Sequence, residues 1–258
     1  MNIKVIVASH KPYKMPADSC YLPVQVGAKD KQTIDGFTPD NTGDNISEKN
    51  PYFCELTGLY WAWKNLECDY LGLAHYRRHF KGKNRGKDKI DAALTSDEMK
   101  ALFDTADIIL PAKRKYYIEN LYDHYVHTML PDPLIETGKI IKEKHPEYYD
   151  EFQRLKSRTS AHMFNMYIMK KEISDGYCEW LFDILFELEK RIDLTGYDPF
   201  QARFYGRVSE LLLDVYINTK GLKYLENPAV HTEKINWWKK GTGFLMAKFF
   251  GKKYEKSC

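Results

Sequence analysis

The stretch from Asp69 to His79 has the sequence Asp-Tyr-Leu-Gly-Leu-Ala-His-Tyr-Arg-Arg-His. Its first six residues are mostly apolar and are bounded by polar segments, so they predict a buried β-strand over residues 69–74. Four of the five residues that follow, from His75 to His79, can carry positive charge. The chain therefore leaves the predicted core through a basic cluster, which we expect to be functional.

Short apolar strands alternate with amphipathic helices along the rest of the chain. Further strands are predicted over residues 3–7, 21–26, 106–111 and 163–169. Helices are predicted from Glu55 onward, after the capping box of Thr95 and Glu98, and over residues 181–188 and 208–215. This alternation predicts an α/β sandwich with a mostly parallel central sheet flanked by helices.

Three polar segments follow predicted parallel strands, namely Ser9–Lys11, His75–His79 and Pro111–Lys115. The carboxyl ends of parallel strands lie at one edge of the sheet, where ligands of open α/β sheets bind. We therefore predict that these three segments meet at the same edge.

Length and charge exclude several classes of protein. The 258 residues carry 39 Lys and Arg against 36 Asp and Glu, a net charge of +3, and 43% of the residues are hydrophobic. A general nucleic-acid binder needs a larger basic excess, and a disordered chain has fewer apolar residues. No apolar run is long enough to span a bilayer, and no leader is visible at the start, so we expect a cytoplasmic protein. The five cysteines are scattered and predict reduced thiols.

The basic cluster at residues 75–79 is the densest candidate for binding an anion. The guanidinium groups of Arg77 and Arg78 offer paired donors that suit phosphate, and His75 can donate or change its protonation near neutral pH. The alternative is a solvated strand end whose cations pair with carboxylates. Because the cluster emerges directly from a buried strand, we favour anion binding.

The segment after the first strand contains Ser9, His10, Lys11 and Tyr13. It has no glycines of a dinucleotide or P-loop fingerprint. Its hydroxyl, imidazole, amine and phenol groups could hold a nucleobase and ribose by stacking and hydrogen bonding. An ordinary polar turn explains the segment equally well.

Two further positions combine a structural and a functional interpretation. Asn165, three residues after His162, interrupts an apolar run, so its buried amide either ties down backbone or binds a sugar; a structural role is favoured. Glu210 lies in the predicted first turn of the helix that begins at Arg207, where the helix dipole alone favours a carboxylate. A carboxylate beside an arginine could also remove a proton from a hydroxyl group.

Several catalytic motifs are absent from the sequence. There is no Gly-x-Ser-x-Gly elbow, no His-Glu-x-x-His, no Walker lysine, and no Asp-x-Asp at the end of a predicted strand. His124 and His127 form a His-x-x-His pair, but on a helix they are more typical of surface or pocket residues. We therefore predict no metal ligands and no cofactor, without excluding a divalent metal.

The chain divides into a domain over residues 1–230 and a basic, aromatic segment over residues 231–258. This segment has six lysines between Lys239 and Lys256 against one acid, Glu255, together with several aromatic residues. Such a mixture is typical of a membrane interface with anionic lipid. A terminal helix packed on the domain, or a basic tail without a partner, remains an alternative.

Four blocks of this sequence together resemble a known family. They span residues 50–65, 70–78, 163–166 and 207–212, and the similarity extends over roughly residues 3–230. The family is bacterial, was long labelled a domain of unknown function, and is described as glycosyltransferases of capsular or exopolysaccharide biosynthesis. Some of its members are thought to transfer galactofuranose.

The resemblance implies a GT-A-like, nucleotide-binding fold and the transfer of a hexose such as galactofuranose. A dedicated base such as Glu210 would suit inversion at the sugar. Most GT-A enzymes carry Asp-x-Asp where this chain has His75, Arg77 and Arg78, so these cations are expected to replace the metal and stabilise the departing diphosphate. Glu210 is the expected base. The expected donor contacts are Ser9, His10, Lys11 and Tyr13, and the expected sugar or acceptor contacts are His162, Asn165 and Arg207.

The implied partners are a nucleoside-diphosphate sugar, expected to be a UDP-sugar, and a glycan on a polyprenyl diphosphate. The protein would then act at the inner face of the cell membrane, with residues 231–258 as its peripheral anchor in capsular, exopolysaccharide or O-antigen synthesis. One alternative is a non-catalytic module that binds a sugar nucleotide or assembles the polysaccharide machinery. A phosphate-ester hydrolase is a third option, but the sequence offers it no evident nucleophile.

Overall fold

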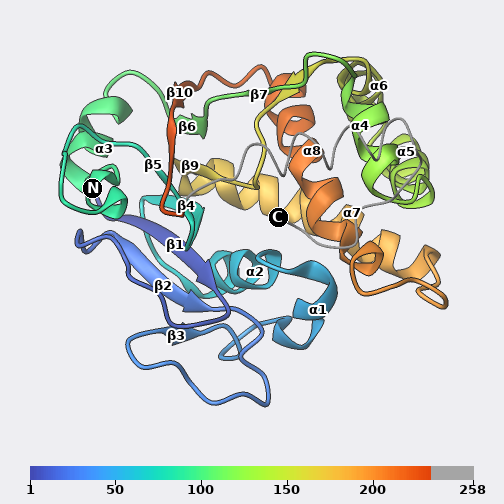
Figure 1. Cartoon of the computed structure of the whole chain (residues 1–258). Helices are drawn as coiled ribbons and strands as arrows, with labels where there is room; N and C mark the ends of the chain where they lie inside the picture. Colours follow the sequence, from blue (N-terminus) through green and yellow to red (C-terminus); the bar gives the residue numbers. More distant parts are fainter. Residues whose placement is uncertain (234–258) are drawn as a thin grey trace.

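The fold is a layered α/β structure built on one large, twisted sheet. A computed structural model describes residues 1–233, and Figure 1 shows the sheet beside a group of helices from the second half of the chain. The predicted segment 231–258 therefore lies almost entirely outside the described residues. The predicted mixed α/β fold with a mostly parallel sheet and flanking helices is confirmed.

Seven strands form the main path of the sheet in the described part of the chain. Their order is β10-β6-β9-β4-β1-β2-β3. The bounds are β1 Ile3–Ser9, β2 Tyr21–Gln25, β3 Thr38–Pro39, β4 Tyr70–His75, β6 Ile108–Pro111, β9 Tyr167–Lys170 and β10 Leu225–Asn227. Pairing is parallel except at β9, which runs antiparallel to β4 and β6. The carboxyl ends of β1, β4 and β6 therefore lie at one edge.

Two short strands extend the sheet at this edge. β5 (Arg78–Phe80) folds back on β4, and β11 (Ala229–His231) pairs antiparallel with β5. A separate ribbon joins β7 (Arg114–Lys115) to β8 (Ser160–Ala161). The β4–β5 turn therefore presents the basic cluster beside the last described residues of the chain.

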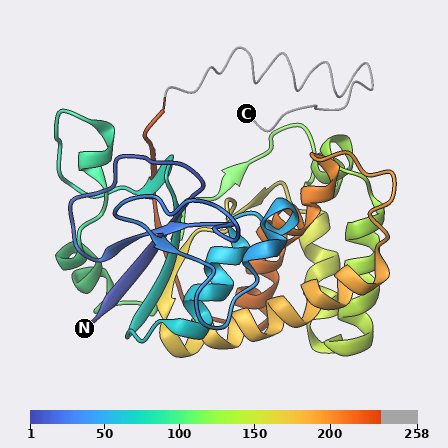
Figure 2. The ribbon, with the colours of Figure 1, turned by 90° about the horizontal axis from the view of Figure 1, so that it is seen from below.

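Eight α-helices are present among residues 1–233. They are α1 Asn50–Phe53, α2 Leu56–Asn65, α3 Ser96–Phe103, α4 Leu121–Thr128, α5 Asp132–Lys144, α6 Tyr149–Lys156, α7 Lys171–Arg191 and α8 Phe204–Thr219. The capping box that opens α3 is present as predicted. Figure 2 shows α4 to α8 gathered to one side of the sheet. None of the helices in this part of the chain is long and apolar enough to cross a membrane.

The sheet has a hydrophobic core on each face, which explains its nearly continuous apolar strands. In β1, Val5 and Val7 pack towards α3, whereas Ile6 and Ala8 pack towards α2, α7 and α8. β4 and β9 approach closely because Gly72 has no side chain. A Cβ there would lie 2.9 Å from both Ile168 Cγ1 and Tyr167 O.

Two local predictions are wrong. The strand predicted over residues 163–169 begins only at Tyr167, and Phe164 and Asn165 instead form a turn with φ of +77° and +55°. Helix α8 begins at Phe204 rather than Arg207, so Glu210 lies in its second turn. The helix dipole acts mainly on the first turn and does not account for that carboxylate.

Candidate active site

A cavity of about 660 Å³ opens at the carboxyl ends of β1 and β4. Four residues singled out from the sequence line it, Ser9, His10, His75 and Arg77. The other lining residues are Ala8, Val26, Asn50, Pro51, Cys54, Glu55, Tyr76, Pro199, Phe200 and Arg203. The predicted meeting of the first two segments is thus confirmed, whereas residues 111–115 do not line the cavity.

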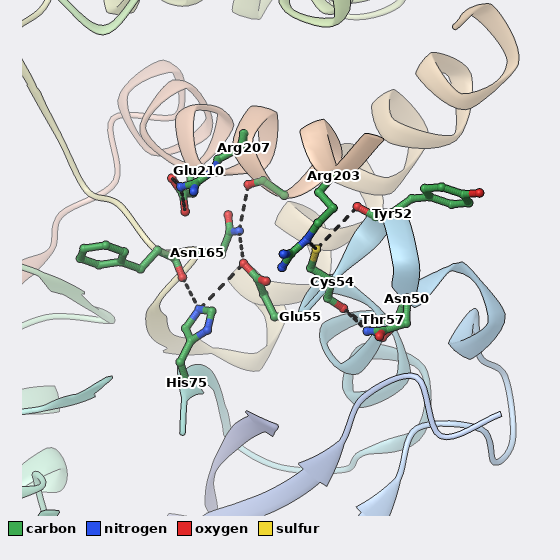
Figure 3. A network of polar contacts seen from close by, with 12 residues as sticks. Asn50, Tyr52, Cys54, Glu55, Thr57, His75, Asn165, Arg203, Arg207 and Glu210 are labelled. Atoms are coloured by element: carbon green, nitrogen blue, oxygen red, sulfur yellow. Dashed lines mark hydrogen bonds and ion pairs between the residues drawn. The ribbon is translucent and has the colours of Figure 1, made fainter. Parts of the chain in front are cut away.

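Glu55 lies at the centre of a hydrogen-bond network in the wall of this cavity (Figure 3). Its Oε1 accepts a hydrogen bond from Asn165 Nδ2 at 2.8 Å and lies 3.9 Å from His75 Nε2. Asn165 Nδ2 also donates to the carbonyl oxygen of Gly206 in α8, at 3.1 Å. His75 Nε2 lies 2.7 Å from the carbonyl oxygen of Phe164, so this nitrogen carries the proton and donates.

Backbone strain is concentrated around Glu55. Asp30, Cys54, Phe164 and Asn165 are the non-glycine residues with positive φ in the described part of the chain. Three of these four border Glu55, since Cys54 precedes it and the Phe164–Asn165 turn holds its carboxylate. Asparagine tolerates this region, but phenylalanine does so only when surrounding contacts impose it. Strain of this kind gathers at functional sites.

The carboxylate of Glu55 is ionised despite its burial. Burial alone would raise the pKa of Glu55, because it penalises the charged form. His75, the hydrogen bonds from Asn165 and from the backbone of Glu55, and the charge of Arg207 outweigh this effect and hold the pKa below its ordinary value. The site therefore keeps a negative charge at neutral pH, with only 16% of the side chain exposed.

Cationic side chains surround this carboxylate. Arg77 lies over the Tyr76 ring at 5.1 Å and 3.6 Å from Glu233 Oε2. Arg203, just before α8, donates from Nε to Cys54 Sγ at 2.9 Å. Burial raises the pKa of Cys54 to about 11, so this sulfur stays a thiol and does not neutralise the arginine.

Arg78 begins β5 and does not line the cavity. Its guanidinium stacks over the Phe164 ring at 4.3 Å, and its buried Nε has no hydrogen-bond partner among the described residues. Burial and the neighbouring Arg77 lower the pKa of Arg78, while the charges of Glu210 and Glu55 oppose this shift. Arg78 therefore adds positive charge beside both carboxylates.

The residues predicted to hold a nucleoside pack together around Tyr76. The rings of His10 and Tyr13 meet the Tyr76 ring edge-on at 5.5 and 4.9 Å, and Lys11 Nζ lies 5.2 Å from its centroid. The Ser9 hydroxyl is used within the loop, because it donates to the carbonyl oxygen of Lys11 at 2.7 Å. Burial, followed by Lys11 and Arg77, lowers the pKa of His10 and favours its neutral form.

Arg207 and Glu210 adjoin the network on the side of α8 (Figure 3). Arg207 Nη1 lies 3.4 and 3.5 Å from the two carboxylate oxygens of Glu210, which is only 7% exposed. The charge of Glu210, and then that of Glu55, raises the pKa of Arg207, so this guanidinium interacts with both carboxylates. Neither Arg207 nor Glu210 lines the cavity itself.

His162 is placed elsewhere. It is 1% exposed, its Nδ1 bonds to Asp214, and its Nε2 lies 3.3 Å from Glu226 Oε1. Its backbone N–H also donates to Asp214 Oδ2 at 3.1 Å. These contacts tie the residue that follows β8 to α8 and β10, outside the lining of the cavity.

The predicted pair His124 and His127 faces a buried carboxylate. Glu119 accepts hydrogen bonds from both Nδ1 atoms, at 2.6 and 2.9 Å. Residues 1–233 hold no group of three or more His, Cys, Asp or Glu side chains arranged to bind a metal ion.

His79 does not belong to the cationic cluster in which its sequence position seemed to place it. It lies fully buried in β5, with its ring edge-on to Tyr21 at 5.8 Å. Burial lowers the pKa of His79 to about 4, so the ring is neutral at pH 7. The cations that follow β4 at neutral pH therefore do not include His79.

The burial of His79 predicts a pH-dependent stability. Its folded pKa lies below the unfolded value of about 6.5, so protonation favours the unfolded chain. The stabilisation is complete above that value and is lost as the pH falls towards 4, by up to about 1.4 kcal/mol per pH unit. His79→Phe should reduce the difference between the free energies of unfolding at pH 7.5 and pH 5.0, measured by urea unfolding. If both proteins lose the same free energy of unfolding between the two pH values, the assignment is contradicted.

Comparisons with known proteins agree with this architecture. A family model described as "Domain of unknown function (DUF4422)" matches residues 4–221. The chain belongs to the DUF4422 family. A solved structure of a bifunctional glycosyltransferase, WbbM, in its apo form is similar to this DUF4422 chain with a TM-score of 0.83 and 30% sequence identity. The match covers 91% of this chain and 46% of that one, so the chain spans about half the length of that chain. A search of curated proteins finds no match.

The DUF4422 chain contains site residues that the sequence did not single out. Glu55, Cys54 and Arg203 line the cavity, yet the sequence marks Glu55 only as the start of a predicted helix and as a member, with Cys54, of a family-specific block. An acid just before an amphipathic helix resembles an ordinary capping residue. The sequence signal for Glu55 is its place in that block, at the start of a predicted helix.

Proposed function

We propose that this protein is a glycosyltransferase that moves a sugar from a nucleoside-diphosphate donor to a glycan acceptor. The observation that carries the proposal is the cavity at the ends of β1 and β4, where cations surround the ionised Glu55. Its similarity to a glycosyltransferase over 91% of the chain supports the same reaction class. Diphosphate is an anionic leaving group, and sugar hydroxyls need both donors and acceptors, which this wall supplies.

In this proposal the donor lies along the edge of the sheet. Arg77, His75 and Arg78 stabilise the charge that builds on the departing diphosphate. His10, Lys11 and Tyr13 hold the nucleoside against Tyr76, and Ser9 shapes the loop that carries them. The basic residues that end β4 support a reaction that needs no divalent metal.

Glu210 is proposed as the base that takes the proton of the acceptor hydroxyl, which suits inversion at the sugar. Its pairing with Arg207 and its place beside the Asn165 turn support an acceptor site next to the cavity. We do not extend the acceptor site to His162, because both of its ring nitrogens already face carboxylates.

The donor assay tests the proposal. Purified protein is incubated with UDP-glucose, UDP-galactose, UDP-galactofuranose, GDP-mannose and dTDP-rhamnose, and free nucleoside diphosphate is measured with and without EDTA. We expect slow hydrolysis of one donor, unchanged by EDTA, and faster release with a glycan acceptor. Binding of a donor without any turnover would favour a non-catalytic sugar-nucleotide module. Loss of activity in EDTA that manganese restores would contradict the metal-free reaction.

The proposed acceptor is a glycan linked to polyprenyl diphosphate at the inner membrane face, in capsular, exopolysaccharide or O-antigen synthesis. A basic loop supports this location. Residues 81–89 contain five Lys or Arg and one acid, Asp88, and line an exposed hollow of about 630 Å³. Lys89 Nζ lies 3.5 Å from the carbonyl oxygen of Glu233, so the loop adjoins the point where segment 234–258 begins.

Binding to vesicles tests the membrane location. Deleting residues 237–258, or replacing Lys83, Arg85 and Lys87 with Glu in the full chain, should weaken binding to phosphatidylglycerol vesicles. Each basic residue near an anionic surface contributes about 1 kcal/mol, so three reversals should reduce binding by at least about tenfold. Transfer to a soluble acceptor should be spared. Unchanged vesicle binding in both variants would contradict the proposed location at the membrane.

A further inference from the structure

Glu55 has a carboxylate oxygen that the protein leaves unused. Both contacts that fix the side chain, from Asn165 and His75, involve Oε1. Oε2 accepts no hydrogen bond from another described residue, although the backbone N–H of Glu55 itself helps to keep the carboxylate charged. Glu55 also lines the cavity and remains partly exposed. One oxygen therefore positions the group, and the other is available to a ligand.

Keeping this charge carries a cost that a structural role does not require. A buried carboxylate with one hydrogen bond from another side chain is unfavourable unless nearby positive charge compensates it. Here the compensation comes from several elements: His75 at the end of β4, the strained turn of Phe164 and Asn165, and Arg207 of α8. A neutral side chain would tie the same elements together at a lower cost.

The layout of charge in the cavity matches the charge separation of glycosyl transfer. As the bond between the anomeric carbon and the diphosphate oxygen breaks, negative charge grows on the diphosphate and positive charge grows on the sugar ring. Arg77 and Arg203 line the same cavity as Glu55. Groups fixed before the reaction stabilise such developing charges most effectively.

We infer that Glu55 is a catalytic residue that contacts the transferred sugar and stabilises the positive charge developing at its anomeric carbon. This inference rests on the proposed function. The electron pair of the broken bond leaves with the diphosphate, the acceptor oxygen bonds to the anomeric carbon, and the acceptor proton goes to Glu210. Glu55 forms no bond and takes no proton.

The chemistry of Glu55 separates this role from that of a base. An efficient general base has a pKa near the working pH, whereas the surroundings of Glu55 hold its pKa below the ordinary value. Such a carboxylate accepts protons poorly and persists as an anion. A lasting negative charge is what a cationic sugar requires.

The test compares variants of the full chain with the donor found in the assay above. Glu55→Gln keeps an acceptor oxygen for Asn165 and removes the charge, Glu55→Asp keeps the charge, and Glu172→Gln on the exposed start of α7 is the matched control. We expect Glu55→Gln to bind the released nucleoside diphosphate, UDP or GDP, within about twofold of the parent protein and to transfer sugar about 10²–10³ times more slowly. Glu55→Asp should transfer sugar at a rate between those of the parent protein and Glu55→Gln. The control Glu172→Gln should transfer at the parent rate.

A binding measurement tests the effect of the negative charge of Glu55 separately from the rate of transfer. With the nucleoside diphosphate bound, the parent protein should bind a cationic iminosugar at least about tenfold more tightly than its neutral carbocyclic analogue, as expected for a hydrogen bond to a charged group. Glu55→Gln should lose this preference; because it compares two ligands on one protein, a folding defect does not imitate the result. A preference that persists in Glu55→Gln, or transfer above a tenth of the parent rate, overturns the inference while leaving the proposed function intact. If the parent protein turns over no donor, the proposed function itself fails.

Discussion

Replacing Glu210 with glutamine should lower the rate of sugar transfer by about 10²–10⁴-fold, the usual contribution of a general base. The carboxylate is 7% exposed and lies 3.4 Å from Arg207, outside the lining of the donor cavity. The loss should therefore appear in kcat for transfer, while the affinity for the nucleoside diphosphate changes little.

A neighbouring charge has to be considered for Glu210. Glutamine leaves Arg207 with Glu55 as its remaining acidic neighbour, so part of the effect can come from a displaced guanidinium. The nucleoside diphosphate affinity and the unfolding midpoint report such displacement, and Glu172→Gln is the control for removing an acid. If Glu210→Gln transfers sugar at the rate of the parent protein, Glu210 is not the base.

Arg77→Ala should reduce kcat/KM by about 10²–10³-fold, the effect of removing one donor that stabilises developing charge. Arg77 lines the cavity, and its guanidinium stacks on Tyr76 and lies near Glu233. Lysine restores charge but not the planar pair of donors, so Arg77→Lys should recover only part of the activity. Nucleoside monophosphate, which carries less charge at this position, should discriminate less between the variants than nucleoside diphosphate.

A matched control for Arg77 is Arg154→Ala. Arg154 is an exposed cation on α6 that pairs with Glu151 and does not line the cavity. It should leave kcat/KM unchanged. Full transfer activity in Arg77→Ala would show that the basic end of β4 does not bind the leaving group.

The architecture and one wall of the cavity could be predicted because they follow from local patterns. The apolar strand over residues 69–74 and the basic residues behind it are adjacent in sequence, and parallel strands bring Ser9 and His10 to the same edge. Asn165 was singled out correctly as a buried amide with a structural contact. Its turn was missed, because an apolar run does not reveal a positive φ.

Glu55 and Arg203 could not be assigned roles from the sequence, because their surroundings are assembled over long distances. Asn165 lies 110 positions from Glu55, and Arg203 lies 149 positions from Cys54. Before folding, Glu55 is one acid at the start of a helix, and Arg203 is one cation among 39 Lys and Arg residues. Only the tertiary contacts separate them from ordinary surface charges.

The central claim is that the cavity between β1, β4 and the start of α2 binds a nucleoside-diphosphate sugar. A crystal structure of the protein with the nucleoside diphosphate released in the donor assay tests it most directly. We predict a diphosphate within hydrogen-bond distance of Arg77, a base or ribose against His10 or Tyr13, and the sugar side of the diphosphate directed towards Glu55. A nucleotide bound elsewhere on the molecule, with this cavity empty at saturating concentration, would contradict the account.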